Sequence, residues 1–68
     1  MDNKRIIQEM LRAIENREEQ ERRLAADYIE LNPSDEKRRT RDKQLILYAF
    51  MLARLDVQEI AKKAGVGV

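Results

Sequence analysis

The chain has 68 residues, 14 of them basic and 13 acidic, so its formal net charge is +1. It has no cysteine and no histidine, which excludes disulfides and removes the usual zinc ligands. A chain this short buries only about 60% of its unfolded surface, so its own core is marginal and self-association is the stabilising device that remains. Because the charges nearly cancel, strong attraction to DNA or to a membrane is not a property of the whole chain.

A first helix is predicted from Lys4 to about Leu31, with Asp2 or Asn3 placed to cap its start. Apolar residues recur at helical spacing in its first half and again near its end. They are Ile6, Ile7, Met10, Leu11 and Ile14, followed by Leu24, Ala25, Tyr28, Ile29 and Leu31.

The middle of this helix, residues 15–23, has no apolar side chain, so we expect it to be solvated. Glu18 precedes Arg22 by four residues, and Glu19 precedes Arg23 in the same way. Each such pair supports the helix by about 0.3 kcal/mol.

Asn32-Pro33-Ser34 predicts the end of the first helix and a turn. Pro33 has no N–H to donate, and the residue before a proline is driven out of the helical region. Ser34 is expected to cap a second helix, which runs from Asp35 to about Arg54.

The stretch Leu45–Leu55 is the most apolar part of the chain, since ten of its eleven residues are apolar and only Arg54 is charged. On a helix, one face holds Leu45, Tyr48, Ala49, Leu52 and Leu55, and a second holds Ile46, Phe50, Ala53 and Val57. A buried strand is the competing interpretation. Leu, Met and Ala outnumber the β-branched residues, which favours a helix buried on several sides.

Asp56-Val57-Gln58-Glu59 matches a capping box and predicts a short third helix over residues 57–64, ended by Gly65. The predicted fold is therefore all-α and forms one domain over residues 1–68. It consists of a long helix, a proline turn, a second helix and a short third helix.

A hairpin about Pro33 would place Leu45–Leu55 beside residues 11–21, where only Leu11 and Ile14 offer substantial apolar surface. The excess apolar face predicts a homodimeric bundle, because each buried Leu, Ile or Phe contributes roughly 1.5–3 kcal/mol. The alternative is that the third helix covers the excess. The predicted dimer interface comprises Leu45, Tyr48, Ala49, Phe50, Leu52, Leu55, Ile14, Leu24 and Tyr28.

The chain offers little chemistry. Without Cys or His, no nucleophile–base arrangement of the usual kind can form, and the only glycines, Gly65 and Gly67, make no phosphate loop. Glu15, Glu18 and Glu19 are ligand types for a hard cation, but a solvated helix face explains them better. We expect no enzyme activity, no cofactor and no metal.

A basic run occupies residues 37–43, with five cations against one anion. It could grip the phosphates of duplex nucleic acid, whereas the competing interpretation is a solvated helix paired with Asp27, Glu30, Asp35 and Glu36. No aromatic residue interrupts the run to stack a base. The candidate nucleic-acid contacts are Lys37, Arg38, Arg39, Arg41, Lys43, Lys62 and Lys63.

The last twelve residues, 57–68, contain Ile60-Ala61-Lys62-Lys63-Ala64-Gly65-Val66. This stretch resembles the Ile-Ala-x-x-Ala-Gly-Val signature in the first half of the helix-turn-helix of bacterial TetR-like and LacI-like transcription regulators. The resemblance implies that Ile60 and Ala64 are buried, that Ala61 admits a neighbouring helix, and that Val66 packs beneath a turn at Gly65. In those families a recognition helix comes next and enters the major groove, and the sequence here stops at Val68, where that helix would begin.

These features favour a small helical homodimer that regulates by contacting another protein, in transcription or replication control. One alternative is a duplex-DNA-binding regulator of helix-turn-helix type, or a truncated fragment of one. Another is the oligomerisation domain of a larger protein. The chain opens with no positively charged leader and apolar core, and its longest uncharged apolar run is far shorter than the ~20 residues of a membrane span, so we expect a cytoplasmic protein without a membrane partner.

Overall fold

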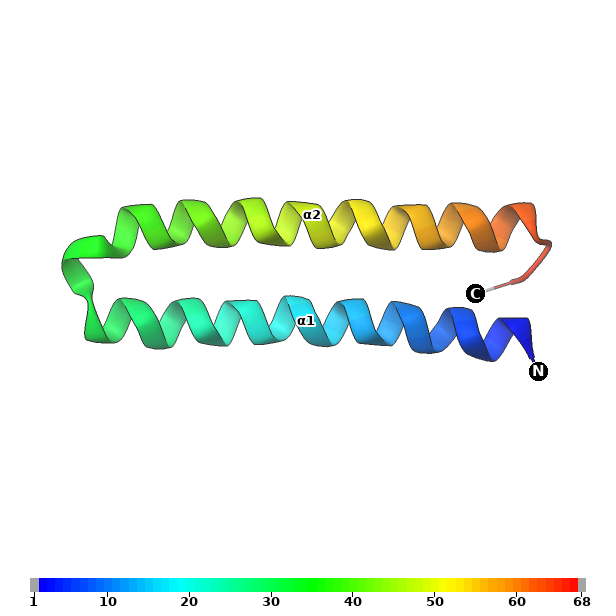
Figure 1. Ribbon diagram of the computed structural model, residues 1–68, viewed down its shortest axis with the longest axis horizontal. Coiled ribbons are helices and arrows are strands. Elements are labelled where there is room, and N and C mark those ends of the chain that lie inside the picture. Colours follow the sequence, from blue (N-terminus) through cyan, green and yellow to red (C-terminus); the bar gives the residue numbers. More distant parts are fainter. Residues whose placement is uncertain (1, 68) are drawn as a thin grey trace.

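The computed structural model describes residues 2–67, which form an antiparallel hairpin of two long helices (Figure 1). Helix α1 spans Asn3–Leu31, the short 3₁₀ helix η1 spans Pro33–Asp35, and helix α2 spans Glu36–Lys63. The hairpin is elongated, 48 × 17 × 12 Å, and both ends of the chain lie at the end opposite η1. The predicted all-α class and the helical hairpin are confirmed. Within the described range, neither helix is both long enough and apolar enough to cross a membrane.

The ends of α1 follow from local hydrogen bonding. The Asp2 side chain accepts a hydrogen bond from the Lys4 backbone N–H at 3.0 Å, which confirms the predicted N-cap. At the other end, Asn32 donates from its backbone to the carbonyls of Tyr28 and Ile29 and from its side chain to the Tyr28 carbonyl. These bonds satisfy acceptors that the end of a helix otherwise leaves open.

The turn differs from the prediction in one detail. Ser34 lies inside η1 rather than at the N-cap of α2, which is Asp35, and no side chain caps that helix. The 3₁₀ bond from the Asp35 N–H to the Asn32 carbonyl, 3.0 Å long, leads directly into α2. The chain therefore enters α2 through a backbone hydrogen bond, and the predicted Ser34 cap is wrong.

The sequence predicted three helices, but the described residues contain two α-helices. Helix α2 continues through Asp56-Val57-Gln58-Glu59, so the predicted end near Arg54 and the separate helix over 57–64 are wrong. A capping box operates only where the chain leaves the helical region. No glycine or proline interrupts residues 36–64, and Val57 and Ala61 pack against α1, which favours one straight helix.

The end of α2 is a Schellman motif. Gly65 has φ of +72°, the left-handed conformation that glycine adopts at little cost. The Val66 N–H donates to the Ala61 carbonyl at 2.8 Å, and the Gly65 N–H donates to the Lys62 carbonyl at 3.1 Å. The predicted stop at Gly65 is confirmed.

The apolar core lies at the open end of the hairpin. Ile7, Val57 and Ala61 are buried there, with Leu11, Ile14 and Val66 packed against them. Toward the turn, the buried residues of α1 are Glu18, Glu21 and Ala25. The hairpin thus encloses a small core and leaves much of the apolar surface of α2 outside it.

Candidate interaction surface

The two apolar faces of the Leu45–Leu55 stretch have different environments. The face with Phe50, Ala53 and Val57 turns toward α1, and Val57 is buried while Phe50 and Ala53 are half-buried. The opposite face remains in solvent: the exposed fractions are 62% for Leu45, 57% for Tyr48, 43% for Leu52 and 50% for Leu55. We call these four residues the outer seam.

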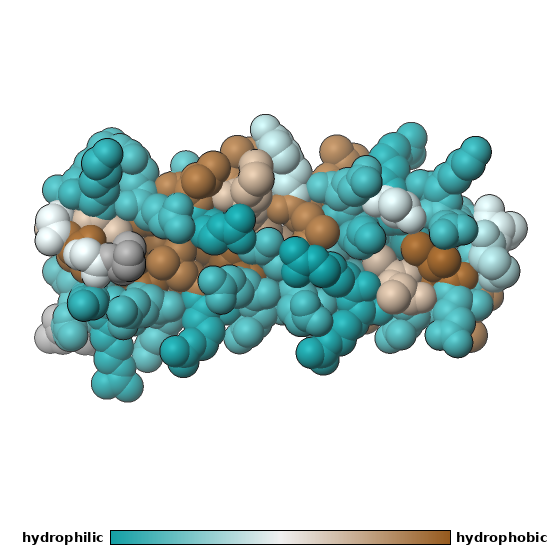
Figure 2. Space-filling view, turned by 180° about the vertical axis from the view of Figure 1, so that it is seen from behind, coloured by the Kyte–Doolittle hydropathy of each residue, from teal (hydrophilic) through white to brown (hydrophobic). Residues whose placement is uncertain are grey.

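Figure 2 shows apolar side chains reaching the outer edge of the molecule over the middle of α2, with polar side chains on either side. The reason lies in helix geometry. Residues that meet α1 recur on one side of α2, and Leu45, Tyr48, Leu52 and Leu55 occupy the other side at spacings of three and four. Within the described chain, no segment covers this side of α2.

The middle of the hairpin contains ion pairs between the helices. Glu18 accepts a hydrogen bond from Arg54, and Glu21 accepts one from Arg39 at 2.6 Å. Glu18 and Glu21 are only 7% and 9% exposed, so the prediction that residues 15–23 are solvated is wrong for these two. The sequence carried a usable signal: Ile14, Glu18, Glu21 and Ala25 continue the buried stripe of α1 at helical spacing. Glu19 is exposed and pairs with Arg22 and Arg23 as a surface residue.

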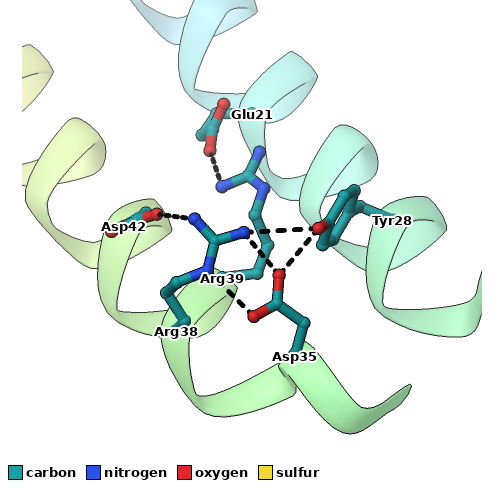
Figure 3. A network of polar contacts seen from close by, with 6 residues as sticks. All are labelled: Glu21, Tyr28, Asp35, Arg38, Arg39 and Asp42. Atoms are coloured by element: carbon teal, nitrogen blue, oxygen red, sulfur yellow. Dashed lines mark hydrogen bonds and ion pairs between the residues drawn. The ribbon is translucent and has the colours of Figure 1, made fainter. Parts of the chain in front are cut away.

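A second polar network holds the turn (Figure 3). The Tyr28 hydroxyl donates to Asp35 Oδ2 at 2.7 Å, and Arg38 Nε donates to Asp35 Oδ1 at 2.8 Å. Arg38 also contacts the second Asp35 oxygen, the Tyr28 hydroxyl and, at 3.8 Å, Asp42. One aspartate thereby joins the end of α1 to the beginning of α2.

The network changes the acidity of Asp35. Hydrogen bonds from the Arg38 guanidinium and then from the Tyr28 hydroxyl lower the pKa of the Asp35 carboxyl from 3.8 to about 2. The Asp35 carboxylate in turn raises the pKa of Arg38, and Glu21 raises the pKa of Arg39. Both guanidinium groups are therefore held in the charged form by the carboxylates that they contact.

Because its folded-state pKa is depressed, ionised Asp35 stabilises the fold above about pH 4, and this contribution is lost as pH falls through about 2. We expect Arg38→Gln to raise the pKa of Asp35 toward 3.8, measured by NMR titration of the carboxyl carbon. Arg5→Gln is the matched control, since Arg5 pairs with Glu9 far from the turn and its loss leaves the titration unchanged. An unchanged titration in Arg38→Gln would contradict the network.

The predicted dimer-interface residues fall into two groups. Leu45, Tyr48, Ala49, Leu52, Leu55 and Leu24 are exposed. Ile14 packs on the core, Phe50 faces α1, and Tyr28 is half-buried in the turn network. Leu24 lines a shallow depression with Ile46 and Phe50, so the hairpin brings it to the flank of α2 rather than to the outer seam.

The basic run does not form one open cationic patch. Arg38 is paired with Asp35 and Asp42, and Arg39, whose side chain is 16% exposed, is paired with Glu21. Lys37 and Arg41 are exposed and Lys43 is half-buried. Lys62 and Lys63 lie near the open end of the hairpin, away from the turn that precedes the basic run (Figure 1).

The residues of the helix-turn-helix-like stretch are placed differently from one another. Ala61 is fully buried against α1, and Val66 packs on the core beneath the turn at Gly65, as expected. Ile60 is 59% exposed and Ala64 is also exposed, so the expectation that they are buried is wrong for this hairpin. The residues of α2 that meet α1 here are Val57 and Ala61, and Ile60 is rotated about 100° away from Ala61.

The fold and this surface define a two-helix hairpin with an exposed apolar seam on one helix. Within residues 2–67, no group of three or more acidic side chains is arranged to hold a metal ion. Comparison of the chain with protein-family models, curated proteins and solved structures finds no match.

Proposed function

We propose that this protein is a small, non-enzymatic helical module that acts as a homodimer and regulates through protein–protein contacts, in transcription or replication control. The observation that supports the proposal is the outer seam, whose four large side chains are 43–62% exposed. Contiguous apolar surface of this kind marks interaction sites on small soluble proteins.

The energetics favour pairing. Burying a fully exposed Leu side chain contributes roughly 1.5–3 kcal/mol, so covering the 43–62% of each seam side chain that is exposed contributes about half of that. In a two-fold dimer each seam residue makes this contribution in both copies. The core within one hairpin is small, with Ile7, Val57 and Ala61 at its centre. Pairing two seams adds a second apolar layer that one chain alone lacks.

Sedimentation equilibrium of the full chain tests the proposal. We expect a mass of twice 8.1 kDa at micromolar concentration, with dissociation to the single-chain mass on dilution. A fully helical protein that sediments as a monomer at every concentration would overturn the homodimer. The regulatory role is tested by affinity capture on the immobilised dimer, which should retain one protein in stoichiometric amount. Retention through washes at high salt would place the contact on apolar surface outside the seam, because apolar contacts are weakly screened.

The second candidate is direct binding of duplex DNA. It is favoured by the exposure of Lys37, Arg41, Lys62 and Lys63, and a dimer would present each of them twice. It is weakened by the pairing of Arg38 and Arg39 with carboxylates. A mobility shift with mixed-sequence duplex at roughly 50 mM salt that disappears steeply with rising salt would support this candidate.

The outer seam would also serve as the interface of an oligomerisation domain. That alternative predicts a dimer that captures no partner protein.

A further inference from the structure

The outer seam has the spacing of a coiled coil. Leu45, Tyr48, Leu52 and Leu55 alternate at intervals of three, four and three residues, the a/d pattern of paired helices. The next positions of the same pattern are Arg41, four residues before Leu45, and Glu59, four residues after Leu55. The seam therefore ends in a cation on one side and an anion on the other.

Both of these charged residues are available. Arg41 and Glu59 are exposed, and neither forms an ion pair with another residue in the range 2–67. By contrast, Arg38, one turn from Arg41, is paired with Asp35 and Asp42. The seam thus has two opposite charges at its ends that the hairpin itself does not use.

We infer that the outer seam binds a second copy of this chain in antiparallel orientation, with Arg41 of each copy opposite Glu59 of the other. This orientation rests on the homodimer proposed above and specifies its geometry. Residues equidistant from position 50 then face each other: Leu45 opposite Leu55, and Tyr48 opposite Leu52. All four apolar positions gain apolar partners, and both ends of the seam gain an ion pair.

The other orientations are less favourable. In a parallel pair, Arg41 of one chain lies beside Arg41 of the other, and Glu59 lies beside Glu59. Like charges then face each other at both ends of the seam. An antiparallel pair shifted by one heptad sets Leu52 opposite Arg41 or Tyr48 opposite Glu59, depending on the direction. Only the antiparallel register centred at position 50 places an apolar residue opposite every apolar residue of the seam and an opposite charge opposite each end.

The hairpin accommodates this arrangement without rearrangement. Residues 41–59 lie entirely within α2, and 19 residues of helix span roughly 27 Å. Ala49, next to the centre, is exposed and small, so it allows the two helices to approach closely. In the resulting dimer the two α2 helices pack together at the centre, and each α1 helix lies on the outside.

Charge exchange tests the pairing. We expect Arg41→Glu to weaken the dimer about 10-fold, because it turns two attractive contacts into two repulsive ones. The exchanged variant Arg41→Glu/Glu59→Arg should return the dissociation constant to within about 3-fold of the native value. Both positions are exposed, so the fold should be unaffected, which circular dichroism checks. If neither variant alters the dissociation constant, the Arg41–Glu59 contact is refuted.

A spin-label distance tests the orientation directly. The chain has no native cysteine, so Lys37→Cys carries a single label at an exposed site thirteen residues from position 50. Antiparallel pairing separates the two labels by about 40 Å along the helices, whereas parallel pairing brings them to roughly 10–15 Å. A short distance in a confirmed dimer overturns the antiparallel orientation and leaves the homodimer standing. Absence of any dimer in the native chain overturns both.

Discussion

Leu52→Glu is expected to convert the proposed dimer into a monomer while leaving the hairpin folded. Leu52 is 43% exposed on the outer seam, and a two-fold dimer would lose two such leucines at once. Full burial of an exposed leucine is worth roughly 1.5–3 kcal/mol, so covering the 43% of each Leu52 that is exposed contributes about 1.3–2.6 kcal/mol over the two copies. Enclosing two unpaired glutamate carboxylates adds at least as much again, so we expect the dissociation constant to rise at least about 100-fold. Sedimentation equilibrium measures that rise, and circular dichroism of the monomer shows whether the helices persist.

The chain offers a matched control. Leu31 is 82% exposed at the end of α1, outside the seam, so Leu31→Glu makes the same chemical change without touching the proposed interface. We expect its dissociation constant to equal that of the native chain. If Leu31→Glu dissociates the dimer and Leu52→Glu does not, the association occurs through another surface and the seam has been wrongly chosen.

Arg54→Ala is expected to destabilise the hairpin by about 2–3 kcal/mol, because it leaves Glu18 with its main partner removed. A fully buried carboxylate that loses its partner costs about 3–5 kcal/mol. The smaller figure applies here because the Arg54 side chain is 31% exposed and Arg22 remains 3.8 Å from Glu18. Urea unfolding followed by circular dichroism, at one total protein concentration for all variants, measures the change.

The double variant Glu18→Leu/Arg54→Leu separates the cost of an orphaned charge from the value of the pair. Leucine at both positions extends the apolar core toward the turn, so we expect stability equal to or above that of the native chain. Arg23→Ala is the control, since Arg23 pairs with Glu19 at 3.4 Å on the surface and should change stability by less than about 0.5 kcal/mol. A double variant less stable than the native chain would mean that the ion pair itself stabilises the fold.

Much of the architecture was predictable from local signals. Asp2, Pro33 and Gly65 mark helix ends through capping, a missing donor and a left-handed turn, and the structure has ends at all three places. The third helix was mispredicted because Asp56 and Glu59 match a capping box in spacing alone. A cap also needs a break in the helical backbone, and packing of Val57 and Ala61 on α1 favours an unbroken helix.

The candidate surface was only partly predictable. Helical spacing predicts the apolar face that contains Leu45, Tyr48, Leu52 and Leu55. It also predicts that α2 has more apolar surface than α1 can bury. The spacing does not predict which of the two apolar faces of α2 points away from α1. That choice depends on how α2 is oriented relative to α1 after the turn. Hydropathy alone does not predict the burial of Glu18 and Glu21, although both residues continue the buried stripe of α1 at helical spacing. Their partners Arg54 and Arg39 could not be predicted, because they are remote in sequence.

The two inter-helix ion pairs also fix the alignment of the helices along their length. Sliding α2 by one turn, about 5.4 Å, would change the distances from Arg54 to Glu18 and from Arg39 to Glu21 at the same time, so the short contacts that both pairs now make could not both be kept. Interchangeable leucines in those layers would tolerate several alignments of similar energy. The two ion pairs in the middle of the hairpin therefore select one alignment of α1 and α2. That alignment fixes the length of the hairpin and the position of each residue on its outer surface.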